Sequence, residues 1–285
     1  AVATSTQHVD SYQPNNSHKI MKTKIAIYIS LICCACTPSR EETAQLIFDD
    51  AIEAYMTKDF DKTKELLDSI IRCYSDVTNS TIEASDMLKI VRKTERIHNK
   101  AILDSLLEVR ESEISKIINN FYIEDPKADP PVFVHKHQSA FSASNRSHLR
   151  SYTDINGIFY MSSNYTGEGR IYHNGVQVKI GENLIITDTI STDAFHHNFE
   201  INGNVWEIVK YKRGTDNGIA SFIASNTNER IDVTFCGHTP SGKQTNYRII
   251  MTDTDKKAIR DTYQLSILLR DICEIKKLQK ENMEQ

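Results

Sequence analysis

The sequence predicts an α+β protein that combines an N-terminal helical hairpin, a long coiled-coil-like helix, an antiparallel β meander and a C-terminal helix. Three observations predict this class. Apolar residues recur at helical spacing up to residue 121 and again after residue 255, and short β-branched or aromatic runs fill much of the segment between. Prolines 126, 130 and 131 separate the two kinds of pattern. We therefore expect a helical domain over residues 41–123, a β domain over 131–252 and a last helix over 255–280.

The first helical segment, residues 42–74, contains two amphipathic stretches joined by a short turn. The pair resembles a single tetratricopeptide-type hairpin, because Phe60, Leu67 and Ile70 fall near the aromatic and small-residue positions of that family. Such repeats bury their apolar faces against neighbouring repeats, and about three are needed for a stable array. One hairpin therefore leaves an apolar face, which we interpret as an interaction surface for a protein or peptide partner.

A single long helix is predicted to follow, over residues 81–123. Large apolar residues recur along it every three or four positions or at multiples of this spacing, in a coiled-coil-like seam: Leu103, Leu107, Ile114, Ile117 and Phe121. The C-terminal helix carries a similar stripe: Leu265, Leu268, Leu269, Ile272 and Ile275. Because the β domain lies between these helices in sequence, we expect the last helix to return along the long one and pack antiparallel to it.

Ten short runs rich in β-branched or aromatic residues predict the strands of the β domain: PVFVHKH, GIFYMSS, RIYH, VQVKI, NLIITDT, HNFEI, VWEIVKYK, GIASFIAS, RIDVTFCG and NYRIIMT. Between some of them lie Asn174-Gly175, Asn202-Gly203 and Asp216-Asn217-Gly218, whose residue types supply the positive φ of hairpin turns. We therefore expect neighbouring runs to pair antiparallel in a meander that is sandwich or barrel-like.

The composition is that of an ordinary globular protein and argues against nucleic acid as the main partner. The 285 residues carry a formal net charge of −4, with 39% hydrophobic and 25% charged residues. Phosphate backbones are bound by clustered lysines and arginines, whereas glutamates alternate with the lysines near the C-terminus.

Catalytic and cofactor signatures are missing from the sequence. It contains no Gly-x-Ser-x-Gly and no His-Glu-x-x-His, and we predict neither a cofactor nor a metal. The alternate spacing of His135 and His137 would place both rings on one face of a strand, but a zinc site needs three or four ligands. If the protein is an enzyme, Asp193, His196 and Glu200 are the residues that we expect to act.

Aromatic residues in and between the predicted strands indicate a different kind of site. They would suit a sugar-binding or peptide-binding face, although aromatic residues at strand spacing more often form cores or cross-strand pairs. The candidates are Phe159, Tyr160, Tyr165, Tyr172, Trp206 and Tyr211.

The segment before residue 37 predicts a tail followed by an export signal. Residues 1–20 are polar and lack any apolar period, so we exclude them from the fold. From Met21 onward, Lys22 and Lys24 form a basic start before an apolar run that is too short to span a membrane.

Residues 21–36 resemble the lipobox signal of bacterial lipoproteins, because the small residue Ala35 directly precedes Cys36. The resemblance implies that the Cys36 thiol is alkylated with diacylglycerol and becomes the mature N-terminus. Cys34, which has Leu31 three residues before it, is the alternative lipidated residue, and an ordinary cleaved signal is the alternative without a lipid.

These features together predict a lipid-anchored protein of the bacterial cell envelope that faces the periplasm or the cell surface. We expect its helices and β domain to act as a binding or scaffolding module. The alternative is a periplasmic or surface hydrolase that uses Asp193, His196 and Glu200 of the β domain.

Overall fold

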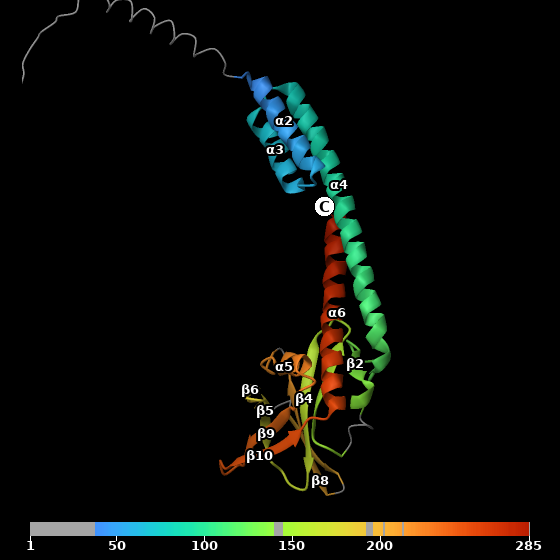
Figure 1. Cartoon of the computed structure of the whole chain (residues 1–285), viewed down its shortest axis with the longest axis vertical. Coiled ribbons are helices and arrows are strands. Elements are labelled where there is room, and N and C mark those ends of the chain that lie inside the picture. Colours follow the sequence, from blue (N-terminus) through green and yellow to red (C-terminus); the bar gives the residue numbers. More distant parts are fainter. Residues whose placement is uncertain (1–37, 140–144, 192–195, 202, 213, 285) are drawn as a thin grey trace, which may run out of the picture. The chain divides into compact units, whose positions relative to one another are not determined.

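The structure, a computed structural model, describes residues 38–139, 145–191, 196–201, 203–212 and 214–284. The tail and the signal predicted over residues 1–36 lie outside these ranges, and so does Asp193. The chain divides into two compact units between Ile97 and His98, and each is described by itself (Figure 1).

Three helical segments form the first unit: α2 (Arg40–Met56), α3 (Phe60–Cys73) and the part of α4 (Thr78–Ile117) up to residue 97. Both early helices start at sequence-encoded caps. Ser39 and Glu42 form a reciprocal capping box at the start of α2, and Asp59 Oδ1 accepts a hydrogen bond from the Lys62 backbone amide at 3.1 Å. The tight turn between α2 and α3 therefore fixes the hairpin.

The core of this unit joins the hairpin to the first half of α4. Its buried residues come from all three helices: Ala51, Phe60, Leu67, Ile70, Ala84, Leu88 and Val91. Leu67 and Ile70 are fully buried, and each such side chain contributes about 1.5–3 kcal/mol. The long helix thus supplies, within the same chain, apolar contacts that a lone hairpin lacks.

Two antiparallel sheets form the centre of the second unit. Their strands are β1 (Phe121–Ile123), β2 (Val132–His135), β3 (His148–Asp154), β4 (Phe159–Gly167), β5 (His173–Ile180), β6 (Asn183–Ile186), β7 (His196–Ile201), β8 (Asn204–Tyr211), β9 (Asp232–His238) and β10 (Gln244–Ile250). One sheet has the order β1-β2-β3-β4-β8-β7, and the other has the order β10-β9-β5-β6. The α+β class is therefore confirmed.

The two sheets share one apolar core, as in a sandwich, and neither closes into a barrel. Leu149 and Met161 of the six-stranded sheet belong to the same buried cluster as Val178 and Phe235 of the four-stranded sheet. Ile259, from the last helix, also belongs to it. Since successive side chains of a strand point to opposite faces, the alternate residues of β3, β4 and β8 point away from this core.

The simple meander that the sequence predicted is wrong, although all strand pairs are antiparallel. The chain leaves the six-stranded sheet after β4, builds β5 and β6 of the other sheet, and returns through β7 and β8. Gly203, at φ 79°, does make the predicted turn between β7 and β8. Adjacent runs therefore pair locally, whereas the order of the sheets depends on contacts far apart in sequence.

One predicted turn and one predicted strand are wrong. Asn174-Gly175 lies inside β5 and does not form a hairpin turn. Gly175 instead allows the Thr187 side chain to approach the strand closely, since an added Cβ would lie 3.0 Å from Thr187 Oγ1. The segment GIASFIAS forms the helix α5 (Ile219–Ser225) in place of a strand, after Gly218 at φ 82°. Short apolar runs fit either structure, and here the preceding turn decides.

The last helix, α6 (Asp253–Glu284), packs against both the β structure and the second half of α4 (Figure 1). Arg110 Nε lies 3.0 Å from Asp271 Oδ2, and Gln279 donates to Asp104 at 2.8 Å. Residue numbers rise along one helix as they fall along the other, so the predicted antiparallel packing is confirmed. The long helix ends earlier than expected, because Phe121–Ile123 pairs with β2.

Within the described residues, no helix is both long enough and apolar enough to cross a membrane.

Candidate functional site

The face of the six-stranded sheet that points away from the core carries a hollow of about 550 Å³. Strand alternation places these side chains there, because every second residue of β3, β4 and β8 points to this face. The hollow is lined by Glu124, Arg150, Tyr152, Ser162, Asn164, His197, Phe199, Ile208 and Lys210. We call this surface the open face.

Stacked aromatic pairs stand at two ends of the open face. Tyr152 on β3 stacks on Tyr160 of β4, with ring centroids 5.1 Å apart and planes at 15°. Phe199 on β7 stacks on Trp206 of β8, with centroids 6.0 Å apart and planes at 11°. Met161 faces Tyr211, so the same register places Tyr160 opposite position 212. Trp206 lies six positions before position 212, so the two aromatic pairs are roughly 20 Å apart along the strand direction.

The floor between these pairs is basic. Arg150 bonds to the Glu124 carboxylate, and its Nε also donates to the Gln138 carbonyl at 3.2 Å. Lys210 is half-buried and has no ion-pair partner among the described residues. Glu124 is the one carboxylate among the side chains that line the hollow, and it is already paired with Arg150. The lining therefore keeps one positive charge without a partner.

Asn164 contributes a buried acceptor to the same floor. His148 Nδ1 lies 3.0 Å from the Arg146 carbonyl, which can only accept, so Nδ1 carries the proton. His148 Nε2 then accepts from the Asn164 amide nitrogen at 3.2 Å, and burial lowers the pKa of this imidazole, which favours the neutral ring. Asn164 is 7% exposed, and its Oδ1 has no hydrogen-bond partner within the described chain.

A serine, a histidine and a glutamate meet in the core in an order that resembles a catalytic triad. Ser163 Oγ lies 2.9 Å from His173 Nε2, and His173 Nδ1 lies 3.1 Å from Glu207 Oε2. All three side chains are at most 1% exposed, so a substrate cannot reach the hydroxyl. Ser163 also bonds to the buried Tyr211 hydroxyl at 3.0 Å. We interpret this group as a structural network between the sheets.

Glu207 is the ionic centre of that network. Burial opposes its ionisation, but hydrogen bonds from the His173 ring and from the backbone amides of His173 and Tyr172 outweigh burial and lower the pKa of this carboxyl. A third amide, that of Ile171, donates to it at 3.1 Å. The charge therefore fixes the chain where it enters β5.

The histidines singled out in the sequence do not form a joint site. His135 ends β2 and is buried, with Nε2 3.4 Å from Asp261, whereas His137 is exposed in the short helical turn η2 (Lys136–Gln138). Their ring centroids lie 5.1 Å apart, but the strand ends between them, so the expected shared strand face is wrong. Among the described residues, no group of three or more His, Cys, Asp or Glu could hold a metal.

The residues that the sequence suggested as catalytic, Asp193, His196 and Glu200, do not form a joint site among the described residues either. His196 and His197 point to opposite faces of β7: the His196 ring centroid lies 6.2 Å from that of His173, while His197 lines the open face. Glu200 is exposed on the same strand, and Asp193 lies outside the described residues.

Sequence patterns located two aromatics of the open face and missed two others. Tyr160 and Trp206 belong to the stacked pairs, whereas Tyr165 and Tyr211 lie in the core. Phe159 packs against Tyr263 of α6, and Tyr172 is exposed at the start of β5. Tyr152 was missed with its whole strand, β3, because HLRSYTD has few apolar residues. Phe199 was missed because it lies alone in a polar run.

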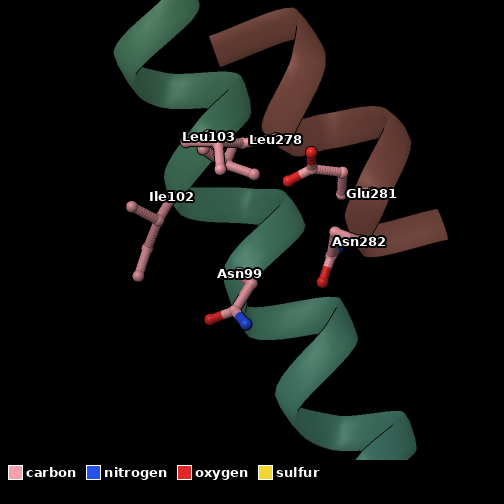
Figure 2. Close-up of a pocket in the computed structure, with 6 residues that line it drawn as sticks. All are labelled: Asn99, Ile102, Leu103, Leu278, Glu281 and Asn282. Carbon is pink, nitrogen blue, oxygen red and sulfur yellow. The ribbon is translucent and has the colours of Figure 1, made fainter. Parts of the chain in front are cut away.

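A second hollow, of about 290 Å³, lies between α4 and the end of α6. Figure 2 shows Leu103 and Leu278 next to one another between the helices, while Ile102 points away from α6. Asn99, Glu281 and Asn282 complete the lining. This groove marks where the seam between the helices ends, and its few polar groups do not converge on one point.

Comparisons with known proteins give no match: no family model, no curated protein and no solved structure is similar to the chain.

Proposed function

We propose that the protein is a lipid-anchored module of the bacterial cell envelope that binds a ligand on the open face of its β domain. The signal-like segment with Cys36 supports the anchor. The helices between the anchor and the β domain in sequence serve as spacer and scaffold.

The observation that carries the binding function is the set of stacked aromatics around a polar, basic hollow. Ligand sites combine apolar and aromatic walls with a small number of polar groups that fix orientation. Here the walls are Tyr152 and Phe199, and the polar groups are Arg150, Asn164 and Lys210.

A capture experiment on the full-length protein tests the binding function. Detergent-solubilised protein is immobilised, solubilised envelope material is passed over it, and retained carbohydrate, lipid and protein are quantified. We expect the double variant Arg150→Ala with Lys210→Ala to retain less than a tenth of what the wild type retains. Lys179→Ala with Lys243→Ala, two exposed lysines outside the open face, is the matched control and should retain the wild-type amount. Equal retention by all three proteins would remove the open face as the binding site.

The anchor is tested in parallel with a clickable fatty acid. Labelling should occur in the wild type and disappear with Cys36→Ser. Labelling that survives Cys36→Ser but disappears with Cys34→Ser would move the lipid by two residues, and no labelling at all would place the protein in the secreted class without an anchor.

A further inference from the structure

We infer that the ligand of the open face is an acidic glycan, a chain of sugar rings that bear carboxylate, sulfate or phosphate groups. This inference rests on the proposed binding function and adds the chemical class of the ligand. Three features of the open face point to it, and each matches a different part of such a molecule.

The stacked aromatic pairs match the apolar faces of sugar rings. Phe199 is 39% exposed, and its ring stacks nearly parallel on that of Trp206, so each ring keeps one face that the other does not cover; we call such a pair a platform. Tyr152 and Tyr160 form a second platform at the other end, where Lys212 Nζ lies over the Tyr160 ring, 6.0 Å from its centroid. Aromatic rings bury large apolar areas while their edges and hydroxyls stay polar. The roughly 20 Å between the platforms calls for an elongated ligand of several rings.

The floor matches sugar hydroxyls. Asn164 Oδ1 is a buried acceptor without a partner among the described residues, and leaving such a group unpaired is energetically unfavourable. Because the atom is covered in this conformation, the amide must turn toward the hollow for a hydroxyl of the ligand to satisfy it. The Ser162 hydroxyl lines the same floor, because Ser162 lies two residues before Asn164 on β4 and points to the same face. This hydroxyl can both donate and accept a hydrogen bond.

The basic side chains match the negative charge. Lys210 has no carboxylate partner in the described structure, and it lies opposite Ser162 in the register of β4 and β8. Arg150 lies opposite Ser162 on the other side, from β3. Two cations therefore flank one row of the floor, and the single carboxylate, Glu124, neutralises only one of them. An acidic group of the ligand, bound at this row, would neutralise the positive charge that Glu124 leaves unpaired.

Single-stranded nucleic acid also combines negative charge with rings that stack on aromatic residues. It is disfavoured because such proteins follow the backbone with a positive groove, whereas this chain has a net charge of −4 and the hollow keeps one unpaired cation. The test therefore includes an oligonucleotide.

Trp206 is the only tryptophan of the chain, so its fluorescence reports on one end of the open face. The detergent-solubilised full-length protein is titrated with tetragalacturonate and with a sulfated heparin tetrasaccharide. The matched neutral probe is the methyl ester of tetragalacturonate, and the nucleic-acid probe is a short oligo(dT). We expect saturable fluorescence changes with at least one acidic glycan, and at least tenfold weaker binding of the neutral ester.

Three variants separate binding from folding. Lys210→Ala should weaken acidic-glycan binding at least tenfold, and Lys210→Arg should restore most of it, with melting temperatures near that of the wild type. Lys179→Ala should bind as the wild type does. Equal affinity for the acid and its ester, tighter binding of oligo(dT), or no response to either acidic glycan would overturn the inference. If envelope material is still retained through Arg150 and Lys210 in that case, the proposed binding function stands and only the ligand class is wrong.

Discussion

At the scale of single residues, the buried carboxylate of Glu207 shows how one charge can organise a chain segment. Its oxygens accept hydrogen bonds from the backbone amides of Ile171, Tyr172 and His173 and lie 3.1 Å from the His173 ring. Backbone groups buried in this way must be paired, so the side chain replaces the strand partner that the segment lacks. The same carboxylate makes the fold sensitive to acid.

We predict that Glu207→Gln lowers the free energy of unfolding at pH 7 by about 1–3 kcal/mol. The folded-state pKa of Glu207 is lowered, so its ionised form contributes stability above its unfolded pKa of about 4.3, and this contribution is lost as the pH falls through the folded value. Urea unfolding between pH 3 and 7 measures this directly. The difference between wild type and variant should shrink below about pH 4; a constant difference across this range would contradict the role of the charge.

A glycine shows how a single residue can mislead a sequence-based prediction. The dipeptide Asn174-Gly175 has the composition of a hairpin turn, yet Gly175 lies in β5. Its missing side chain makes room for Thr187 Oγ1, which accepts a hydrogen bond from the Val176 amide at 3.0 Å. Sequence alone cannot distinguish a glycine that adopts positive φ from one that allows a close approach, because both uses depend on the same missing Cβ.

At the scale of elements, the long helices could be predicted and the short elements could not. The stripes of α4 and α6 repeat over several turns, and that repetition identified both helices and their pairing. By contrast, α5 has seven residues, too few for its period to be recognised, and its position follows from Gly218 and from the bond between Asp216 Oδ2 and the Ala220 amide. Strand β3 was missed because polar residues outnumber apolar ones in HLRSYTD, so its alternation is not one of apolar and polar residues alone.

The helix α6 contacts both the β structure and α4, so we predict that its apolar stripe stabilises the whole second unit. Leu268 and Ile272 are buried at 5% and 9% exposure, and replacing both with aspartate places unpaired charges among apolar groups. The free energy of unfolding should fall by more than about 4 kcal/mol. Hydrogen exchange should show lost protection over residues 98–117 as well as in α6.

The matched control changes exposed positions of the same helix. Cys273→Asp with Lys276→Asp should shift the free energy of unfolding by at most about 0.5 kcal/mol for each residue. Truncation after Asp253 should reproduce the effect of the buried pair. Unchanged protection of residues 98–117 in the truncated protein would show that the long helix does not depend on α6.

At the scale of the whole molecule, the open face explains why function was harder to predict than fold class. Its lining comes from β3, β4, β7 and β8, and the chain crosses to the other sheet between β4 and β7. No stretch of sequence therefore contains the site, and no local spacing between its residues reveals it. Most strands other than β3 could be predicted from their composition, whereas the sheet order that brings Arg150 and Lys210 to the two sides of Ser162 could not.

The same arrangement separates the proposed binding function from the hydrolase alternative. Asp193, His196 and Glu200 are absent from the described lining of the open face, and the His196 ring lies on the core side of β7, near His173. We therefore predict that the triple variant Asp193→Ala, His196→Ala and Glu200→Ala binds acidic glycans within about threefold of the wild type, since a change of this size corresponds to less than about 0.7 kcal/mol. The fluorescence of Trp206 measures binding, and the release of new reducing ends from tetragalacturonate measures hydrolysis in the same samples. Because the binding residues are unchanged in this variant, a loss of reducing-end formation with intact binding would establish the trio as catalytic. A wild type that binds and releases no reducing ends, matched by the variant, would leave the protein as a binding module.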